Sequence, residues 1–248
     1  MAIDPLIYEA PPLPTQGYGL YAAARLIDTG DTSRELLAGT DIHSVNCDLG
    51  SGTYGTDLCE TPPAVKTPGT PGPVGHFDPI VVYAASACAT GPWVRPPVDR
   101  ARQTLTLREP GLVESAFGAR MLVDAEVESA DGLVEALGAV EAWLGERGIA
   151  GYVHASRRHA ALAASLGLIA TTGAALRTSL GNTWVFGGGY DSALGTTLVA
   201  TGPVTVWRSS VFERDVRTGA DGSTETYALA ERVVTVGYEC DALAVTIA

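Results

Sequence analysis

A stretch rich in proline and glycine sets the strongest limit on the fold of this chain. Residues 61–75 read Thr-Pro-Pro-Ala-Val-Lys-Thr-Pro-Gly-Thr-Pro-Gly-Pro-Val-Gly, and residues 10–14 read Ala-Pro-Pro-Leu-Pro. Proline lacks the amide donor and restricts the residue before it, so neither stretch is helical. We expect residues 1–79 to be irregular apart from a short helix near 20–27. Because an arm and a long loop are costly to order on a monomer, a neighbouring subunit is a natural source of ordering contacts.

The second half of the chain carries regular helix signals. Apolar residues recur at helical spacing over 131–147, and a second, alanine-rich helix over 157–166 has Ser156 as its N-cap. A more polar helix over 96–117 precedes both. We expect an interruption near Pro110, because a proline inside a helix removes a backbone hydrogen bond.

Strands account for most of the remaining sequence. Alternating or β-branched runs predict them at 79–90, 149–154, 183–186, 196–200, 204–208, 229–238 and 243–247. Helices with intervening and following strands indicate an α+β fold rather than a doubly wound α/β repeat.

Composition favours an assembly over several other classes of protein. Hydrophobic residues make up 46% of the chain and charged residues only 18%, which suits a large core or extensive buried interfaces. The net charge of −12 argues against tight nucleic-acid binding. Residues 1–60 carry nine acids and two arginines (−7), whereas residues 93–120 carry five arginines and three acids (+2). Stretches of opposite net charge in one chain suit pairing between neighbouring copies of that chain.

The sequence predicts neither a membrane partner nor secretion. No apolar stretch reaches the length of a membrane span, and residues 1–5 lack the basic and apolar regions of a signal peptide. Four cysteines are too few and too scattered for a disulfide-built scaffold. We therefore expect synthesis in the cytoplasm.

Cys47 and Cys59 lie twelve residues apart, with His43 four residues before Cys47. A zinc site needs a fourth ligand and usually a CxxC pair, so we expect no metal site. Packed or free thiols are the leading interpretation. The alternative is a local disulfide between Cys47 and Cys59, worth about 3 kcal/mol.

No catalytic constellation is apparent. His154 and His159 flank two arginines, but the first histidine ends a predicted strand and the arginines open a predicted helix. The three glycines at 187–189 have no nucleotide-binding motif around them, so we expect a turn with positive φ there. We expect no catalytic residues and no cofactor.

Four strings in the C-terminal half carry a resemblance to a known family. They are Leu-Val-Glu-Ala-Leu-Gly-Ala-Val-Glu-Ala-Trp at 133–143, Leu-Gly-Asn-Thr-Trp-Val-Phe-Gly-Gly-Gly-Tyr at 180–190, Leu-Val-Ala-Thr-Gly-Pro-Val-Thr-Val-Trp-Arg at 198–208 and Ala-Glu-Arg-Val-Val-Thr-Val-Gly-Tyr at 230–238. Their order resembles that in the major capsid proteins of tailed bacteriophages, whose fold encapsulins share. The resemblance covers roughly 120–248, and the first half matches by layout only. The chain lacks the long charged N-terminal helix that serves as a fused scaffold.

The resemblance implies a phage major-capsid-type fold with an N-terminal arm, an extended loop, a spine helix, a peripheral domain and an axial domain. The arm would be residues 1–40 and the extended loop 41–90. The spine helix and peripheral domain would span 91–170 and 226–248, and the axial domain 171–225.

The function implied is that of a major capsid protein in a virion. It would self-assemble, in the host cytoplasm, into hexamers and pentamers of an icosahedral head around double-stranded DNA, which it would contact non-specifically. Scaffolding, portal or decoration proteins are further candidate partners. The alternatives are an encapsulin-like compartment shell, or a small-ligand-binding or enzymatic α+β domain, which predicts a pocket with converging polar groups.

The resemblance also implies which residues contact neighbouring subunits. They come from the arm, the extended loop, the start of the spine helix and the glycine run: Tyr18, Tyr21, Lys66, Arg95, Arg100, Arg102, Arg108, Gly188, Tyr190 and Asp191. The four arginines would form ion pairs between subunits or face the interior of the shell. Some capsids of the family cross-link a loop lysine to an asparagine of a neighbour. Asn46 and Asn182 are the candidate partners of Lys66 in such a link.

Overall fold

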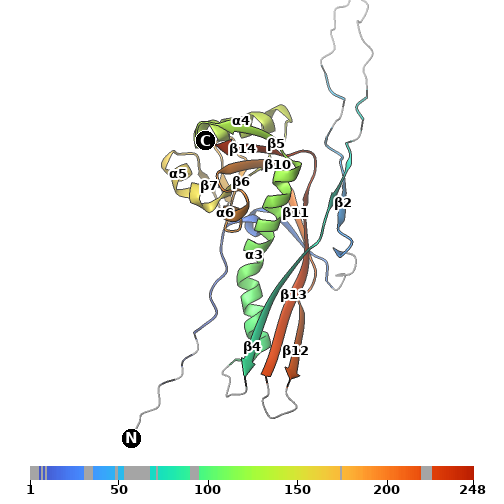
Figure 1. Ribbon diagram of the computed structural model, residues 1–248. Helices are drawn as coiled ribbons and strands as arrows, with labels where there is room; N and C mark the ends of the chain where they lie inside the picture. Colours follow the sequence, from blue (N-terminus) through green and yellow to red (C-terminus); the bar gives the residue numbers. More distant parts are fainter. Residues whose placement is uncertain are drawn as a thin grey trace, which may run out of the picture.

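The computed structural model describes residues 10–30, 36–47, 50–52, 68–70, 72–89, 95–173, 175–218 and 225–248, together with residues 6 and 8. It has the α+β architecture that the sequence predicts. Figure 1 shows a layered body of sheet and helices, and a long ribbon of strands that leaves the body alongside one long helix.

A seven-stranded mixed sheet forms the centre of the body. In spatial order its strands are β5 (Glu126–Ala130), β14 (Leu243–Ile247), β10 (Thr197–Thr201), β6 (Tyr152–Ser156), β9 (Thr183–Gly187), β8 (Ala175–Arg177) and β7 (Ala170–Thr172). Every residue of β9 and β10 is buried, because the sheet is covered on both faces. This is why both strands carry nearly continuous apolar runs rather than alternating ones.

Two helices cover one face of this sheet. They are α4 (Leu133–Glu146) and α5 (Ala160–Ser165), and α5 follows a 3-10 turn, η1 (Arg157–His159). Leu198 of β10 packs in the same buried cluster as α4, whereas its neighbour Val199 joins the core on the opposite face. The hydroxyl of Ser156 accepts a hydrogen bond from the Arg158 amide, which confirms the predicted N-cap.

The long helix α3 (Pro97–Asp124) crosses the other face of the body and continues along the ribbon (Figure 1). It runs unbroken through Pro110, so the predicted interruption is wrong. The missing hydrogen bond is outweighed by packing, since Leu105 and Val113 are fully buried on the same face on either side of the proline. None of the described helices combines the length and apolar character needed to cross a bilayer.

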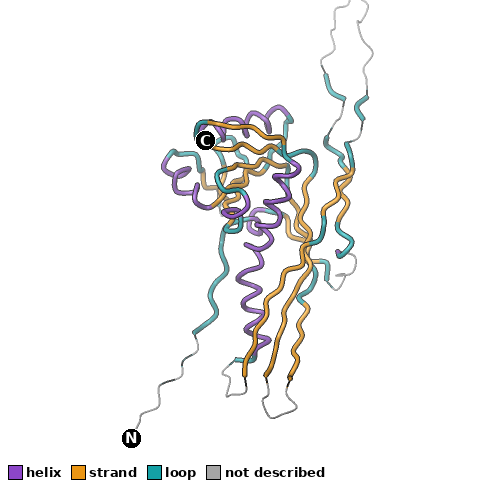
Figure 2. The backbone as a smooth tube through the Cα atoms, viewed as in Figure 1, coloured by secondary structure: helices purple, strands orange, loops and turns teal. Residues whose placement is uncertain are grey.

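The ribbon is built around the longest strand, β13 (Glu225–Tyr238). The first part of β13 lies between β4 (Ile80–Ala89) and β12 (Phe212–Thr218), and its last part pairs with β11 (Val204–Arg208). Helix α3 covers one face of the ribbon, as Figure 2 shows from the backbone trace. The two-residue alternation of β4 and β13 therefore points alanines and valines at the helix on one side and leaves the other side open.

The first part of the chain adds a short helix, one strand of the ribbon sheet and a separate hairpin. A short helix, α1 (Leu20–Ala23), is followed by β1 (Arg25–Asp28), which pairs in parallel with β11. Only the first turn of the helix predicted near 20–27 is helical, and the rest of that range belongs to β1. The hairpin of β2 (Thr40–His43) and β3 (Val74–Phe77) forms a separate two-stranded sheet.

The packing does not follow the predicted domain boundary at 171–225. Within that range β7 to β10 belong to the seven-stranded sheet, whereas β11 and β12 belong to the ribbon sheet. The last strand, β14, returns to the body. The chain passes between the two sheets several times, so contiguous sequence ranges do not describe the two units.

Candidate subunit interface

The face of the ribbon turned away from α3 exposes several large apolar side chains. We call this surface the outer ribbon face; its residues are Val81, Tyr83, Ala85 and Ala87 of β4, Tyr227, Leu229, Glu231 and Val233 of β13, and Phe212, Arg214 and Val216 of β12. The exposed fractions are 63% for Tyr83, 53% for Phe212 and 49% for Val216. Single exposed apolar residues are common, but a contiguous set of this kind marks a surface for interaction.

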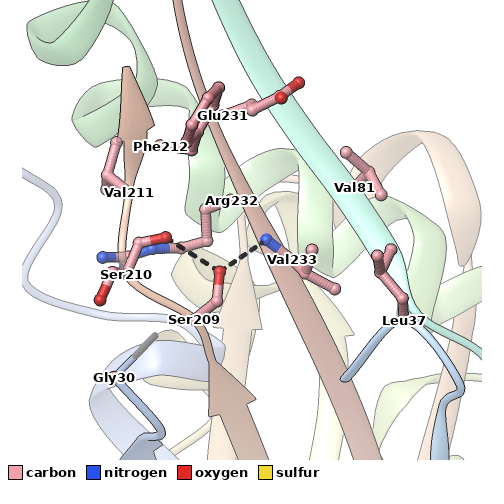
Figure 3. Close-up of a pocket in the computed structure, with 10 residues that line it drawn as sticks. All are labelled: Gly30, Leu37, Val81, Ser209, Ser210, Val211, Phe212, Glu231, Arg232 and Val233. Carbon is pink, nitrogen blue, oxygen red and sulfur yellow. Dashed lines mark hydrogen bonds between the residues drawn. The ribbon is translucent and has the colours of Figure 1, made fainter. Parts of the chain in front are cut away.

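Two hollows lie along the outer ribbon face. The larger, with a volume of about 510 Å³, is lined by ten residues, which are labelled in Figure 3: Gly30, Leu37, Val81, Ser209, Ser210, Val211, Phe212, Glu231, Arg232 and Val233. The second, about 300 Å³, lies further along the strands between Tyr227, Val216 and Ala85. Together they form an apolar track on the ribbon.

Two of the polar side chains that line the larger hollow have partners inside the chain. The Ser209 hydroxyl accepts from the amide of Val233 at 3.1 Å and donates to the Ser210 carbonyl at 2.9 Å (Figure 3). The Arg232 guanidinium reaches Glu109 of α3 at 3.2 Å. The lining residues contain no nucleophile paired with a base, so the hollow suits an apolar side chain better than a reacting substrate.

A buried carboxylate anchors the root of the arm, residues 18–21, to the body. Glu114 of α3, 2% exposed, accepts hydrogen bonds from the amides of Leu20 and Gly189, each at 2.9 Å. Burial raises the pKa of Glu114, and the two amides oppose that rise by stabilising the charged form. Arg157 donates to the Tyr18 carbonyl at 2.9 Å and so fixes the same segment from the other side.

A second buried carboxylate on α3 lies one turn away and contacts the ribbon. Glu109 accepts from the Tyr21 hydroxyl at 2.8 Å and from Arg232 at 3.2 Å. Burial, followed by the negative charge of Glu109, raises the pKa of Tyr21. Neither anchor was predicted from the sequence. The available signal was the spacing of Glu109, four residues from Leu105 and four from Val113, which places a carboxylate on the buried stripe of the helix.

The three glycines at 187–189 permit close packing instead of a turn with positive φ, which corrects our prediction. None of the three has a positive φ. A Cβ on Gly189 would lie 2.0 Å from the carbonyl oxygen of Gly111, and one on Gly187 would lie 2.8 Å from the Glu114 carboxyl carbon. The short helix α6 (Tyr190–Ala193) begins directly after them, where no helix was expected.

The residues predicted at the arm and the glycine run have different environments. Tyr18 is 53% exposed and Gly188 is exposed, so both remain available to a neighbour. The side chain of Tyr190 is fully buried and its hydroxyl lies 3.0 Å from His154 Nδ1, so the prediction of an inter-subunit contact is wrong for this side chain. Asp191 pairs with Arg158 at 2.6 Å within the chain; hydrogen bonds from Arg158 and Ser156 lower the pKa of Asp191 to about 2.

The predicted arginines lie at the start of α3. Arg102 pairs with Glu213 of β12 and with Asp99, and Arg95 donates to Gln103 at 2.5 Å. Both are thus engaged inside the chain. Arg100 and Arg108 are exposed and form no ion pair with the described residues.

Two further predictions concern the extended loop. Cys47 forms a disulfide with Cys240, which contradicts both the leading interpretation of packed or free thiols and the alternative Cys47–Cys59 bond. The two bonded residues are 193 apart in sequence, and their Cα atoms are 5.7 Å apart. Cys59 and Lys66 lie outside the described residues. Asn182 is buried and bonded to Gly151 and Glu141, which makes it unsuitable for a cross-link.

Comparison with solved structures decides the fold. A capsid of an empty GTA particle matches with a TM-score of 0.58 and 12% identity, over 99% of this chain and 95% of that chain. Mycobacterium phage Cain matches with a TM-score of 0.57 and 11% identity, over 98% and 95%. The chain has a phage-capsid-type fold. The SrpI encapsulin of Synechococcus elongatus PCC 7942 matches as well, with a TM-score of 0.53 and 8% identity, over 97% and 92%.

The capsid-type fold extends over nearly the whole chain, including the first half, which the sequence related to the family only by layout. No protein-family model and no curated protein matches the sequence. At 8 to 12% identity the likeness therefore lies in the path of the backbone.

Proposed function

We propose that this chain is a shell subunit that assembles with copies of itself. The observation that carries the proposal is the outer ribbon face, an apolar track left open on a chain whose fold recurs, end to end, in capsid subunits. Large apolar surfaces of this kind are the cores of obligate interfaces. The exposed arm residues Leu6, Tyr8 and Leu13, which are 93%, 77% and 68% exposed, suit contacts with a neighbouring subunit.

We further propose the form of the shell. It consists of hexamers and pentamers in an icosahedral virion capsid around double-stranded DNA, assembled in the host cytoplasm. The phage and GTA capsids among the structural matches support this form. Contact with DNA is non-specific, in keeping with the net charge of −12. Scaffolding, portal and decoration proteins are candidate partners. We propose no enzymatic role for the subunit.

The second candidate is an encapsulin-like compartment shell, which the match to the SrpI encapsulin favours. The two candidates differ in what the shell encloses. A co-purifying enzyme cargo indicates the compartment, whereas nuclease-protected double-stranded DNA indicates the capsid.

Electron microscopy of the purified protein, with a matched pair of variants, tests the proposal. We expect closed shells or capsomers from the natural sequence. Val216→Glu on the outer ribbon face should abolish them, because a buried unpaired carboxylate opposes the interface. Val127→Glu is the control, since Val127 is also an exposed strand valine, 72% exposed, on the edge strand β5.

Two results would contradict the proposal. A natural chain that remains a monomer at all concentrations excludes a shell subunit. Shells that form equally well from Val216→Glu and Val127→Glu exclude the outer ribbon face as the contact. Circular dichroism of both variants checks that each still folds.

A further inference from the structure

The stem of the extended loop, the hairpin of β2 and β3, meets the body at the end of β13. Ile42 and Phe77 pack so closely on Gly237 that a Cβ there would lie 2.7 Å and 2.8 Å from their side chains. The rings of Phe77 and Tyr238 meet edge to face at 5.3 Å. These contacts are few, and the stem has no strand pairing with either large sheet. Arg120 of α3 adds to them, since it lies over the Phe77 ring at 5.1 Å and 3.9 Å from Asp78. Apart from the chain itself, which runs from β3 into β4, the stem is held to the body by this small set of non-covalent contacts.

The turn after β13 supplies a second attachment. Glu239 accepts hydrogen bonds from the backbone amides of Val45 and Asn46, the latter at 2.6 Å, and from the Asn46 side chain at 2.7 Å. Burial alone would raise the pKa of Glu239, but these hydrogen bonds bring it below its ordinary value. The carboxylate thus orients the segment that leaves β2 and presents Cys47 to the next residue of the turn, Cys240.

The backbone at Cys240 points to a role for its sulfur. Its φ is +72°, and among the described residues it is the only one other than glycine in the left-handed region. Glycine or asparagine is the usual residue in this conformation, because a Cβ is strained there. A cysteine at this position is disfavoured locally, which indicates that its side chain has a use that offsets the strain. The bond to Cys47 is that use.

We propose that Cys47 and Cys240 form a redox latch that fixes the direction of the extended loop relative to the body. This proposal rests on the proposed function, because the loop is expected to reach a neighbouring subunit. While both thiols are reduced, Glu239 and the small apolar contact hold the stem. Oxidation then locks it in place.

The step is a two-electron oxidation. Each thiol loses one proton and one electron, and one sulfur–sulfur bond forms. A small-molecule disulfide such as oxidised glutathione takes up the two electrons and two protons and leaves as two thiols. Reduction by excess thiol reverses the step.

The single lysine of the chain makes a direct test of the bond possible. A lysine-specific protease cuts the chain once, after Lys66, into fragments of 66 and 182 residues, with Cys47 in one and Cys240 in the other. We expect digestion of the denatured, alkylated, oxidised protein to leave the fragments linked on a gel without reductant and separate with it. In Cys47→Ser the fragments should separate without reductant, whereas in Cys88→Ser they should stay linked. Fragments of the natural chain that separate without reductant would overturn the latch, and would point instead to a Cys47–Cys59 bond or to free thiols.

A second measurement tests whether the bond stiffens the subunit. Dithiothreitol should lower the guanidinium midpoint of unfolding by about 1 M in the natural chain and in Cys88→Ser, because the bond closes a very long segment. It should leave the midpoint of Cys47→Ser unchanged. Equal midpoints with and without reductant in the natural chain would contradict the proposal. Both measurements use the subunit before assembly, so they decide the latch even if microscopy finds no shell and the proposed function fails.

Discussion

The body and the ribbon bury their strands differently. In the body, β9 and β10 are buried along their whole length, with helices packed on both faces of the sheet. In the ribbon, β4 alternates between buried Val82 and Ala84 and exposed Val81 and Tyr83. The body is thus complete within one chain, whereas the ribbon is finished on one side only. The difference supports the proposed interface, because a partner would cover the face of the ribbon that lacks a second layer.

Large-to-small substitutions in the two regions give the largest expected difference. Leu198→Ala removes a fully buried side chain of β10 and should lower the free energy of unfolding by about 2–5 kcal/mol. Tyr227→Ala on the outer ribbon face, where the tyrosine is 47% exposed, should cost less than about 1 kcal/mol in the unassembled subunit. Denaturant titration measures both. Similar losses in the two variants would mean that the ribbon is as self-contained as the body.

The root of the arm joins the two regions and should show an intermediate effect. Glu114→Gln keeps the shape of the side chain but presents an amide donor to the amides of Leu20 and Gly189, so one of them loses its acceptor. We expect a loss of about 1–3 kcal/mol in the free energy of unfolding. Hydrogen exchange should also become faster at Leu20. The control is Glu146→Gln on the exposed side of α4. Unchanged hydrogen exchange at Leu20 in Glu114→Gln would show that the Glu114 carboxylate does not hold the arm.

The smallest expected effect is a pH dependence located in the body. Burial lowers the pKa of His154 to about 3, against an ordinary value of 6.5. The unfolded chain therefore binds a proton between these two values while the folded chain does not. Stability is full above pH 6.5 and falls as the pH falls towards 3, by about 1 kcal/mol between pH 7.5 and 5.5. His154→Gln should show a shallower slope in denaturant titrations at several pH values, and an unchanged slope would assign the effect to other groups.

The helices and strands of the second half could be predicted because the patterns that indicate them involve only neighbouring residues. The alternation before Tyr238 and the helical spacing over α4 depend on residues a few positions apart. Pro110 shows the limit of this reasoning, since its local preference for a break is overridden by burial of Leu105 and Val113 on both sides. The packing of the helix, rather than its sequence, decided its length.

The attachments that hold the arm and the extended loop to the body could not be predicted in the same way. Glu114 and Leu20 are 94 residues apart, and Cys47 and Cys240 are 193 apart. No spacing rule links such pairs, because only the completed fold brings them together. Gly187 and Gly189 are similar, since their need for small size comes largely from α3, whose contacting residues lie more than seventy positions earlier in the chain.

The length of β13 has a mechanical consequence. Its 14 residues span about 46 Å, at roughly 3.3 Å per residue. One end is paired with β11 beside the body, and the other lies between β4 and β12 at the far end of the ribbon. The strand therefore transmits force from the tip of the ribbon to the body. We expect it to bend near Val234, where its pairing with β4 ends and only the pairing with β11 continues. A force on the tip would therefore act mainly at that point. Helix α3 packs against β13 and would limit how far the strand bends.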